Sequence, residues 1–146
     1  LILRFIRNLA EYERLLHEVA ASEADIVRDL FGPNPRVFCD IACWDGAPAG
    51  FALWFYNYST FHGRHGIYLE DLFVEPAYRG RGIGKALLVQ LARRCRAEGL
   101  TRLKWWVLDW NRASIEFYKS LGAVPMDDWT VLRLSGDALQ KLAEQP

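Results

Sequence analysis

The stretch from Arg79 to Lys85, which reads R-G-R-G-I-G-K, constrains the fold of this chain more than any other. The residues before it, 67–74, read as a β-strand, and after it apolar residues recur at helical spacing up to Cys95. The glycines of the stretch permit positive φ, which lets several backbone N–H groups point at one anion. The first turn of a helix adds unpaired N–H groups and the positive end of the helix dipole. The sequence therefore predicts a strand, a phosphate-binding or pyrophosphate-binding loop and a helix, in that order.

Known phosphate-binding patterns narrow this interpretation. A Walker loop requires G-x-x-x-x-G-K-S/T, but Gly80 to Gly84 is one residue too short and Ala86 stands where the hydroxyl is needed. The spacing G-x-G-x-x-G of a dinucleotide-binding loop is also broken. The pyrophosphate-loop pattern Q/R-x-x-G-x-G/A does fit, with Arg79, Gly82 and Gly84 in its fixed positions, and the cationic side chains of the loop suit the same ligand. A basic, glycine-rich turn without a ligand is the alternative at this point.

Composition sets the broad class of the protein. The 146 residues suit a single domain, 1–146, with 51% hydrophobic residues and a formal net charge of zero. This balance indicates neither disorder nor binding of nucleic acid, and no apolar run is long enough to span a membrane. Three cysteines without C-x-x-C spacing and three scattered histidines predict a cytoplasmic location and no metal site. Because the chain starts at Leu1, inside a predicted helix, we expect that a first N-terminal strand is missing.

The order of the predicted elements defines the fold class. An amphipathic helix is expected over 1–16, and a capping box from Ser22 to Asp25 opens a second short helix that stops before Gly32. The remaining predictions are strands at 37–44 and 49–58 joined by the hairpin signal Asp45-Gly46, a loop at 59–66, the strand at 67–74, a helix ending at Gly99, a strand at 102–108, a helix at 111–121, a strand at 130–134 and a helix at 137–144. This order indicates an α/β fold, a mixed sheet with helices on both faces.

A second polar group follows the predicted strand at 102–108. At 100° per residue, Asn111, Ser114 and Tyr118 fall on one narrow face of the predicted helix, so three polar side chains line one wall. Taken alone, an N-cap Asn with a half-buried Tyr is the simpler interpretation. The position of the segment after a pyrophosphate loop favours a wall that faces a ligand.

These segments together resemble a known family. The loop, the W-N-x-x-S-x-x-F-Y-x-x-x-G-A segment at 110–123 and the strand residues Y-L-E-D at 68–71 are similar to the GCN5-related N-acetyltransferases (GNAT), in their diamine acetyltransferase (spermidine/spermine N1-acetyltransferase) branch. The resemblance implies a homodimer and the GNAT fold, a mostly antiparallel, splayed sheet that binds acetyl-CoA where the strand at 72–74 parts from the strand at 105–108. The implied cofactor-binding residues are Leu72, Phe73, Val74, Arg79, Gly80, Arg81, Gly82, Ile83, Gly84, Lys85, Asn111, Ser114 and Tyr118.

The chemistry of amide formation suggests the catalytic residues. A primary amine must lose a proton before it attacks a thioester, and the departing thiolate benefits from receiving one. Glu70, on an otherwise apolar strand face with Tyr68, is the candidate base, and Tyr118 is the candidate acid. Asp71 is expected on the opposite face in a structural role, and a backbone N–H near Phe73 is expected to polarise the thioester carbonyl. No cysteine nucleophile is required, so we expect direct transfer in a ternary complex.

The acceptor implied by the resemblance is a small-molecule amine. Where polyamine enzymes of the branch carry an acidic residue, this chain has Ser59-Thr60, which together with Gly63-Arg64 is similar to the thialysine N-ε-acetyltransferase subgroup, whose acceptors are lysine-like amino acids. Arg64 is expected to meet an acceptor carboxylate, with a solvated loop charge as the alternative. The implied substrate-binding residues are Tyr12, Glu13, Thr60, Arg64 and Glu70. A polyamine or diamine acceptor, such as spermidine or putrescine, and a non-catalytic acyl-CoA sensor remain alternatives.

Overall fold

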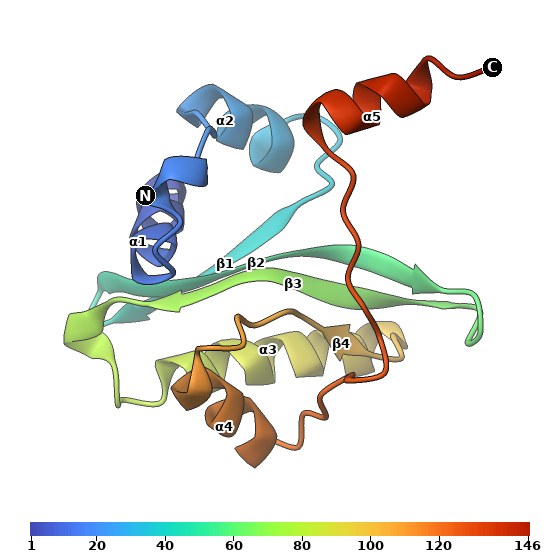
Figure 1. Ribbon diagram of the computed structural model, residues 1–146. Helices are drawn as coiled ribbons and strands as arrows, with labels where there is room; N and C mark the ends of the chain where they lie inside the picture. Colours follow the sequence, from blue (N-terminus) through green and yellow to red (C-terminus); the bar gives the residue numbers. More distant parts are fainter. The chain divides into compact units, whose positions relative to one another are not determined.

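The computed structural model describes all residues from 1 to 146, in two compact units, 1–108 and 109–146 (Figure 1). The first unit contains helices α1 (Ile2–Tyr12), α2 (Glu23–Phe31) and α3 (Ile83–Glu98), strands β1 (Phe38–Trp44), β2 (Ala47–Ser59), β3 (Arg64–Val74) and β4 (Leu103–Lys104), and the short 3-10 helices η1 (Leu16–Glu18) and η2 (Pro76–Tyr78). The second unit contains α4 (Arg112–Ser120) and α5 (Gly136–Ala143). None of the helices combines the length and the apolar character needed to cross a membrane. The organisation as a single domain and the missing first strand remain predictions.

The two N-terminal helices begin and end for local reasons. α1 is shorter than the predicted helix at 1–16, because the chain leaves it after Tyr12 and Arg14 adopts a positive φ of 63°. α2 starts at the predicted capping box. The Asp25 N–H donates to Ser22 Oγ (3.3 Å), and the Ser22 N–H donates to Asp25 Oδ2 (2.9 Å). The second helix is therefore confirmed with its predicted start.

Four strands form one sheet in the order β1-β2-β3-β4. β2 is antiparallel to both β1 and β3, whereas β3 and β4 are parallel. Asp45 and Gly46, between β1 and β2, have φ of 48° and 78°, both positive as a type I′ hairpin turn requires. The loop predicted at 59–66 is wrong in extent, because β2 continues to Ser59 and β3 already starts at Arg64. The mixed, mostly antiparallel sheet confirms the predicted fold class.

α1 and α2 cover one face of the sheet, and α3 covers the other (Figure 1). The core under α1 centres on the fully buried Phe5, whose ring stacks on Phe51 with the ring centroids 5.3 Å apart. Leu9, Leu53 and Phe73 complete this cluster. Each such side chain contributes roughly 1.5–3 kcal/mol when it is buried. The apolar stripe predicted for the first helix is thus the face that fixes α1 on the sheet.

The opposite face of the sheet is tied to α3 through Trp54. Its Nε1–H donates to Asp40 Oδ2 (2.9 Å), and the Arg94 guanidinium of α3 lies over the indole, 4.9 Å from the ring centroid. Because side chains alternate along a strand, Leu53 on the α1 face and Trp54 on the α3 face mark the two sides of β2.

β3 contains an irregularity that the sequence pattern did not indicate. Trp54 pairs with Leu69, but Leu53 pairs with Asp71, so Glu70 is an extra residue in the ladder, a β-bulge. The bulge shifts the alternation of β3, and Asp71 therefore faces α1 together with Leu53. Tyr68 lies on the same face, since its pairing partner there is Phe55. The prediction that a regular alternation places Asp71 opposite Tyr68 is wrong.

β4 is much shorter than the strand predicted at 102–108. Only Leu103 and Lys104 pair with β3, opposite Ile67 and Tyr68. Beyond this point residues 105–108 make no ladder with β3. The predicted length of the strand is wrong, because the segment after β4 separates from β3. This separation is the splay of the sheet that the resemblance implies.

The second unit keeps its predicted helices and lacks its predicted strand. α4 and α5 correspond to the helices expected at 111–121 and 137–144. Residues 130–134 form no ladder, so the strand predicted there is wrong.

Candidate functional site

The loop at 79–85, here called the phosphate loop, has the backbone that an anion site needs. Gly80 and Gly82 have φ of 76° and 78°, whereas Gly84 lies in the first turn of α3. Gly82 is the N-cap of α3 without a side-chain cap, and the first helical bond runs from the Ala86 N–H to Gly82 O (2.9 Å). The N–H groups of residues 83–85 therefore have no partner within the helix. The glycine loop and the helix start combine into a cradle for a phosphate or pyrophosphate group.

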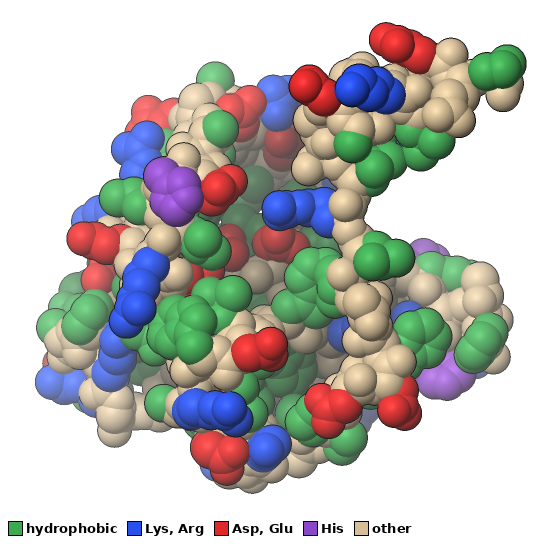
Figure 2. Space-filling model, in the orientation of Figure 1, with side chains coloured by type: hydrophobic (Ala, Val, Ile, Leu, Met, Phe, Trp, Pro, Cys, Tyr) green, Lys and Arg blue, Asp and Glu red, His purple; other side chains and the backbone are tan.

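The cationic side chains of the phosphate loop differ in their contacts, because two of them contact other parts of the fold and one is exposed. Arg79 Nε–H donates to Val74 O (2.9 Å), and the Arg81 guanidinium lies over the Trp44 ring, 5.0 Å from its centroid. Lys85 is exposed in the first turn of α3. Lys and Arg side chains gather on the side of the first unit where the end of α1 approaches the phosphate loop (Figure 2). The two arginines are held against neighbouring parts of the fold, which the sequence did not indicate.

β3 has an open edge over residues 69–74, where β4 no longer pairs with it. At its end, the Glu75 N–H donates to Ala49 O on the β2 side (2.8 Å). Bonded and non-bonded pairs alternate along an antiparallel ladder, so the backbone groups of Val74 and Leu72 point away from β2, to the open edge. Both residues are among those that the resemblance implies for cofactor binding.

Phe73 directs its own backbone groups toward β2. By the same alternation it forms a bonded pair with Phe51, so its N–H is directed into the ladder. Its carbonyl oxygen also faces β2, since it would lie 2.6 Å from a Cβ placed on Gly50. The ring is buried in the core with Phe5. The N–H near Phe73 that faces the open edge is that of Val74, and its role in polarising the thioester carbonyl remains a prediction.

Three carboxyl groups come together where the end of α1 meets β3; we call Glu13, Glu70 and Asp71 the acidic group. Burial, together with the charges of Glu70 and Glu13, raises the pKa of Asp71 from 3.8 to about 7. Burial also raises the pKa of Glu13. Glu70 is exposed on the bulge, so the enclosed position predicted for it belongs to Asp71. A partly buried group of this charge favours a cation.

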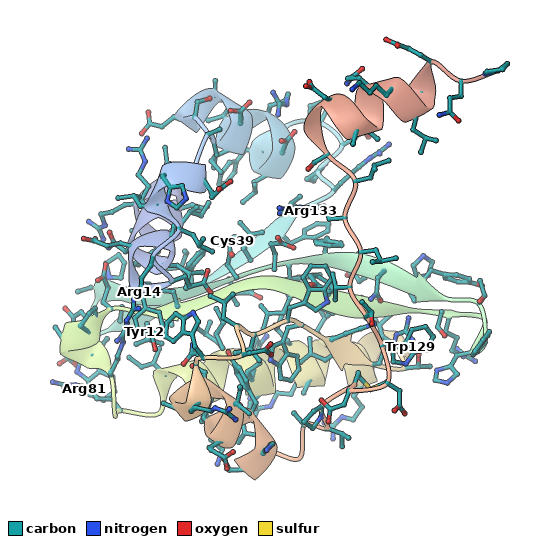
Figure 3. The ribbon with its side chains drawn as sticks, viewed as in Figure 1. Tyr12, Arg14, Cys39, Arg81, Trp129 and Arg133 are labelled. Atoms are coloured by element: carbon teal, nitrogen blue, oxygen red, sulfur yellow. The ribbon has the colours of Figure 1, made fainter.

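Cys39 of β1, labelled in Figure 3, packs against the core cluster under α1. Burial and the charges of Asp40 and Asp71 raise its pKa to about 12. The thiol therefore stays protonated at neutral pH and is a poor nucleophile. This property agrees with direct transfer of the acyl group to an amine.

The tip of the β2–β3 hairpin lies far from the acidic group. Arg64 begins β3, and Glu70 follows it six residues later in the same extended strand, which corresponds to about 20 Å. Thr60 is in the turn at the same end, and the Arg64 guanidinium lies near Gly99 at the end of α3. The structure thus brings Tyr12, Glu13 and Glu70 to one end of the sheet and leaves Thr60 and Arg64 at the other. Within one protomer these two residues are therefore apart from the rest of the predicted acceptor set, and their role in acceptor binding remains a prediction.

α4, in the second unit, presents the predicted polar wall. Asn111 is its N-cap, and Asn111 Oδ1 accepts the Ser114 N–H (3.3 Å). Ser114 and Tyr118 are one turn apart and share a helix face. Both the capping interpretation and the shared face were predicted, and the two are compatible.

The residues that sequence reasoning missed are Asp71 as the buried carboxyl group and two ties between α1 and the segment after β3. Asn8 Nδ2–H donates to Glu75 Oε1 (3.0 Å), and the Arg79 guanidinium lies over the Tyr12 ring. The spacing of four between Asn8 and Tyr12, which places both on one face of the first helix, was the available signal.

Comparison with known proteins decides the class to which this architecture belongs. The family model of the Acetyltransferase (GNAT) family matches residues 4–123. The chain belongs to this family. A thialysine N-ε-acetyltransferase of Bos taurus is 40% identical over 153 residues, which cover 97% of this chain and 89% of the relative. An L-ornithine N5-acetyltransferase of Arabidopsis thaliana is 43% identical over 110 residues, 75% of this chain and 48% of the relative.

Solved structures agree with the assignment of the fold. An integron cassette protein from the mobile metagenome of V. cholerae superposes with a TM-score of 0.78 at 30% identity, covering 94% of this chain and 86% of that protein. The protein is therefore a GNAT-fold N-acetyltransferase, and enzymes of this family use acetyl-CoA as their co-substrate.

Proposed function

We propose that this N-acetyltransferase transfers the acetyl group of acetyl-CoA to the side-chain amine of a lysine-like amino acid, by direct attack in a ternary complex. The observation that carries this choice is the acidic group, in which the half-buried Asp71 lies close to Glu13 and Glu70. An acceptor ammonium group compensates the charge gathered there. The names of the thialysine and ornithine N-acetyltransferases among the relatives support a short acceptor of this kind.

The residues proposed to hold acetyl-CoA are those of the phosphate loop and the open edge of β3. The backbone N–H groups of residues 80–85 and the Lys85 ammonium suit the pyrophosphate. The free backbone groups of Leu72 and the Val74 N–H suit the amides of the pantetheine arm. Asn111, Ser114 and Tyr118 are proposed to complete the cofactor-binding residues from α4.

The proton transfers are assigned to Glu70, Asp71 and Tyr118. Asp71, with a pKa near neutrality, accepts a proton from the acceptor ammonium, and the exposed Glu70 exchanges it with solvent. Glu70 thus shares with Asp71 the role of base. When bound, acetyl-CoA supplies the thioester carbon, to which the amine nitrogen forms a C–N bond as the C–S bond breaks. The Tyr118 hydroxyl donates a proton to the departing sulfur, and the second proton that the amine nitrogen loses on forming the amide passes through solvent to restore the hydroxyl.

A homodimer in the cytoplasm is part of the proposal. Several apolar side chains after α4 are exposed, namely Val124, Met126, Trp129, Val131, Leu132 and Leu134. A second copy of the chain would cover such a surface. The three cysteines are all free, which suits a reducing compartment.

The test is the release of free CoA from acetyl-CoA, measured with a thiol reagent after quenching, across thialysine, lysine, ornithine, putrescine and spermidine. We expect turnover with the lysine-like amino acids. In the Tyr118→Phe variant the rate should fall by about 100-fold or more, the usual contribution of a general acid.

Two outcomes would overturn the proposal. A clear preference for spermidine would assign the enzyme to polyamine acceptors. Binding of acetyl-CoA without turnover on any amine of the panel would favour the acyl-CoA sensor.

A further inference from the structure

The side chain of Arg79 extends from the phosphate loop toward α1. Its Nε–H donates to Val74 O (2.9 Å), which fixes the direction of the guanidinium plane. That plane lies over the Tyr12 ring, 5.0 Å from the ring centroid, and over the Phe73 ring at 5.5 Å. The side chain therefore connects the loop to the last residue of α1.

Arg81 provides an internal comparison two residues away. It makes the same kind of contact, with its guanidinium 5.0 Å from the centroid of the Trp44 ring. Figure 3 shows Tyr12 at the end of α1 and Arg81 farther out in the loop. Trp44 belongs to the β1–β2 hairpin, so only the contact of Arg79 involves a residue predicted to bind the acceptor.

A second contact ties the same face of α1 to the same segment. Asn8 Nδ2–H donates to Glu75 Oε1 (3.0 Å). Asn8 and Tyr12 are one helical turn apart on α1, while Glu75 and Arg79 flank η2. The end of α1, which carries Tyr12 and Glu13, is thus held at two points by the segment that leads from the open edge of β3 into the phosphate loop.

We infer that Arg79 is a positioning residue for the acceptor and that its side chain does not bind the pyrophosphate. The Arg79 side chain holds Tyr12 and the end of α1 in a fixed position relative to the phosphate loop. The acceptor bound at Tyr12 is thereby aligned with the acetyl group of the cofactor. This inference rests on the proposed function. Arginine is required because its planar guanidinium stacks on a ring while Nε–H keeps a fixed direction, which the point charge of lysine does not reproduce.

The kinetic test compares Arg79→Lys and Arg79→Gln with Arg94→Lys as the matched control, because the Arg94 guanidinium makes the same kind of contact with Trp54, outside the proposed site. The acceptor KM is measured at saturating acetyl-CoA, and the Kd of CoA is measured by calorimetry. We expect the acceptor KM to rise by about two- to fivefold in both Arg79 variants, the loss of one exposed cation–π contact. The Kd of CoA should change less than twofold, and Arg94→Lys should change neither value. A CoA Kd weakened more than fivefold in Arg79→Gln, with the acceptor KM unchanged, would show that the side chain binds pyrophosphate and would overturn the inference.

A measurement without turnover separates this inference from the proposed function. The protein is labelled with 3-fluorotyrosine, and the ¹⁹F resonance of Tyr12 is assigned through its loss in Tyr12→Phe. We expect Arg79→Lys to shift this resonance and Arg81→Lys to leave it in place; an unmoved resonance in Arg79→Lys would overturn the inference. If the wild type acetylates none of the amines, the proposed function fails, while the resonance and the titration with CoA still report on Arg79.

Discussion

The phosphate loop and the acidic group are built from different parts of the chain. The loop presents backbone N–H groups, fixed by the positive φ of Gly80 and Gly82. The acidic group presents side chains, brought together from α1 and from the bulge in β3. A site made of backbone tolerates most side-chain changes but depends on its glycines. A site made of side chains depends on their charge and on the register of the strand that carries them.

The largest effect is expected at the acidic group. Asp71→Asn removes the carboxyl group that accepts the proton of the acceptor amine, so kcat/KM should fall by about 100- to 10,000-fold. The Kd of CoA should stay unchanged, because the phosphate loop is intact. Steady-state kinetics and calorimetry on the same preparation check both values. A variant that retains more than a tenth of the wild-type kcat/KM would remove Asp71 from the mechanism.

The same carboxyl group makes stability depend on pH. Its pKa is 3.8 in the unfolded chain and about 7 in the folded one, so the folded state binds more protons between these values. The free energy of unfolding should therefore decrease as pH rises from about 4 to about 7. The full difference in pKa corresponds to at most about 4 kcal/mol. Urea denaturation at pH 5 and pH 8 should show this slope in the wild type and a flatter one in Asp71→Asn; equal slopes would contradict the burial of the charge.

A smaller effect is expected at the phosphate loop. Gly82→Ala places a Cβ at a φ of 78°, where the added atom meets no neighbour within 4 Å but the backbone is strained. The positive φ costs an alanine about 1–2 kcal/mol, so we expect the loop to relax to another backbone conformation when no ligand is bound. Binding of CoA must then restore the strained conformation, which weakens its affinity by about tenfold. Gly63→Ala is the matched control, because Gly63 has a φ of 61°, has the same open surroundings and lies in the hairpin turn. If the two variants bind CoA with equal Kd values, the backbone conformation at Gly82 does not contribute to cofactor binding.

Removal of the charge of Glu13 tests whether this member of the acidic group contributes to binding of the acceptor. Glu13→Gln should raise the acceptor KM by about fivefold, the loss of one partly screened charge contact, while kcat changes little. Glu11→Gln, an exposed position on the same helix, should leave KM unchanged. If both variants behave alike, the effect is one of general surface charge.

The smallest effect is expected at the tip of the β2–β3 hairpin. Arg64→Gln should change the acceptor KM less than twofold, because Arg64 and Glu70 are separated by about 20 Å of extended strand. Initial rates with lysine and thialysine check this value. A tenfold rise would indicate that the tip of one protomer serves the acceptor site of a second copy.

The phosphate loop was predictable because its signals are local. The glycines of residues 79–85, the Asp45-Gly46 turn and the capping box at Ser22 each specify a backbone conformation within a few residues. The resemblance to the acetyltransferases then added the expected roles of these segments. None of these features depends on how distant parts of the chain meet.

The acidic group was predictable only in part, because it depends on pairing between distant residues. The bulge at Glu70 exists only relative to Leu53 and Trp54 in β2, and no local signal in the sequence gives that register. A regular alternation therefore assigned Asp71 to the wrong face. The strands predicted at 102–108 and 130–134 fail for a similar reason, since a strand requires a partner as well as suitable residues.

The raised pKa of Cys39 also bears on how the enzyme can be quantified. A thiol-directed dye reacts with thiolates, so Cys39, with a pKa of about 12, should remain unlabelled in the folded enzyme. Cys95 is buried, and burial raises the pKa of its thiol as well. Cys43 is exposed. The native protein should therefore take up one equivalent of dye per chain, and further uptake on denaturation would count the fraction of molecules that had been folded.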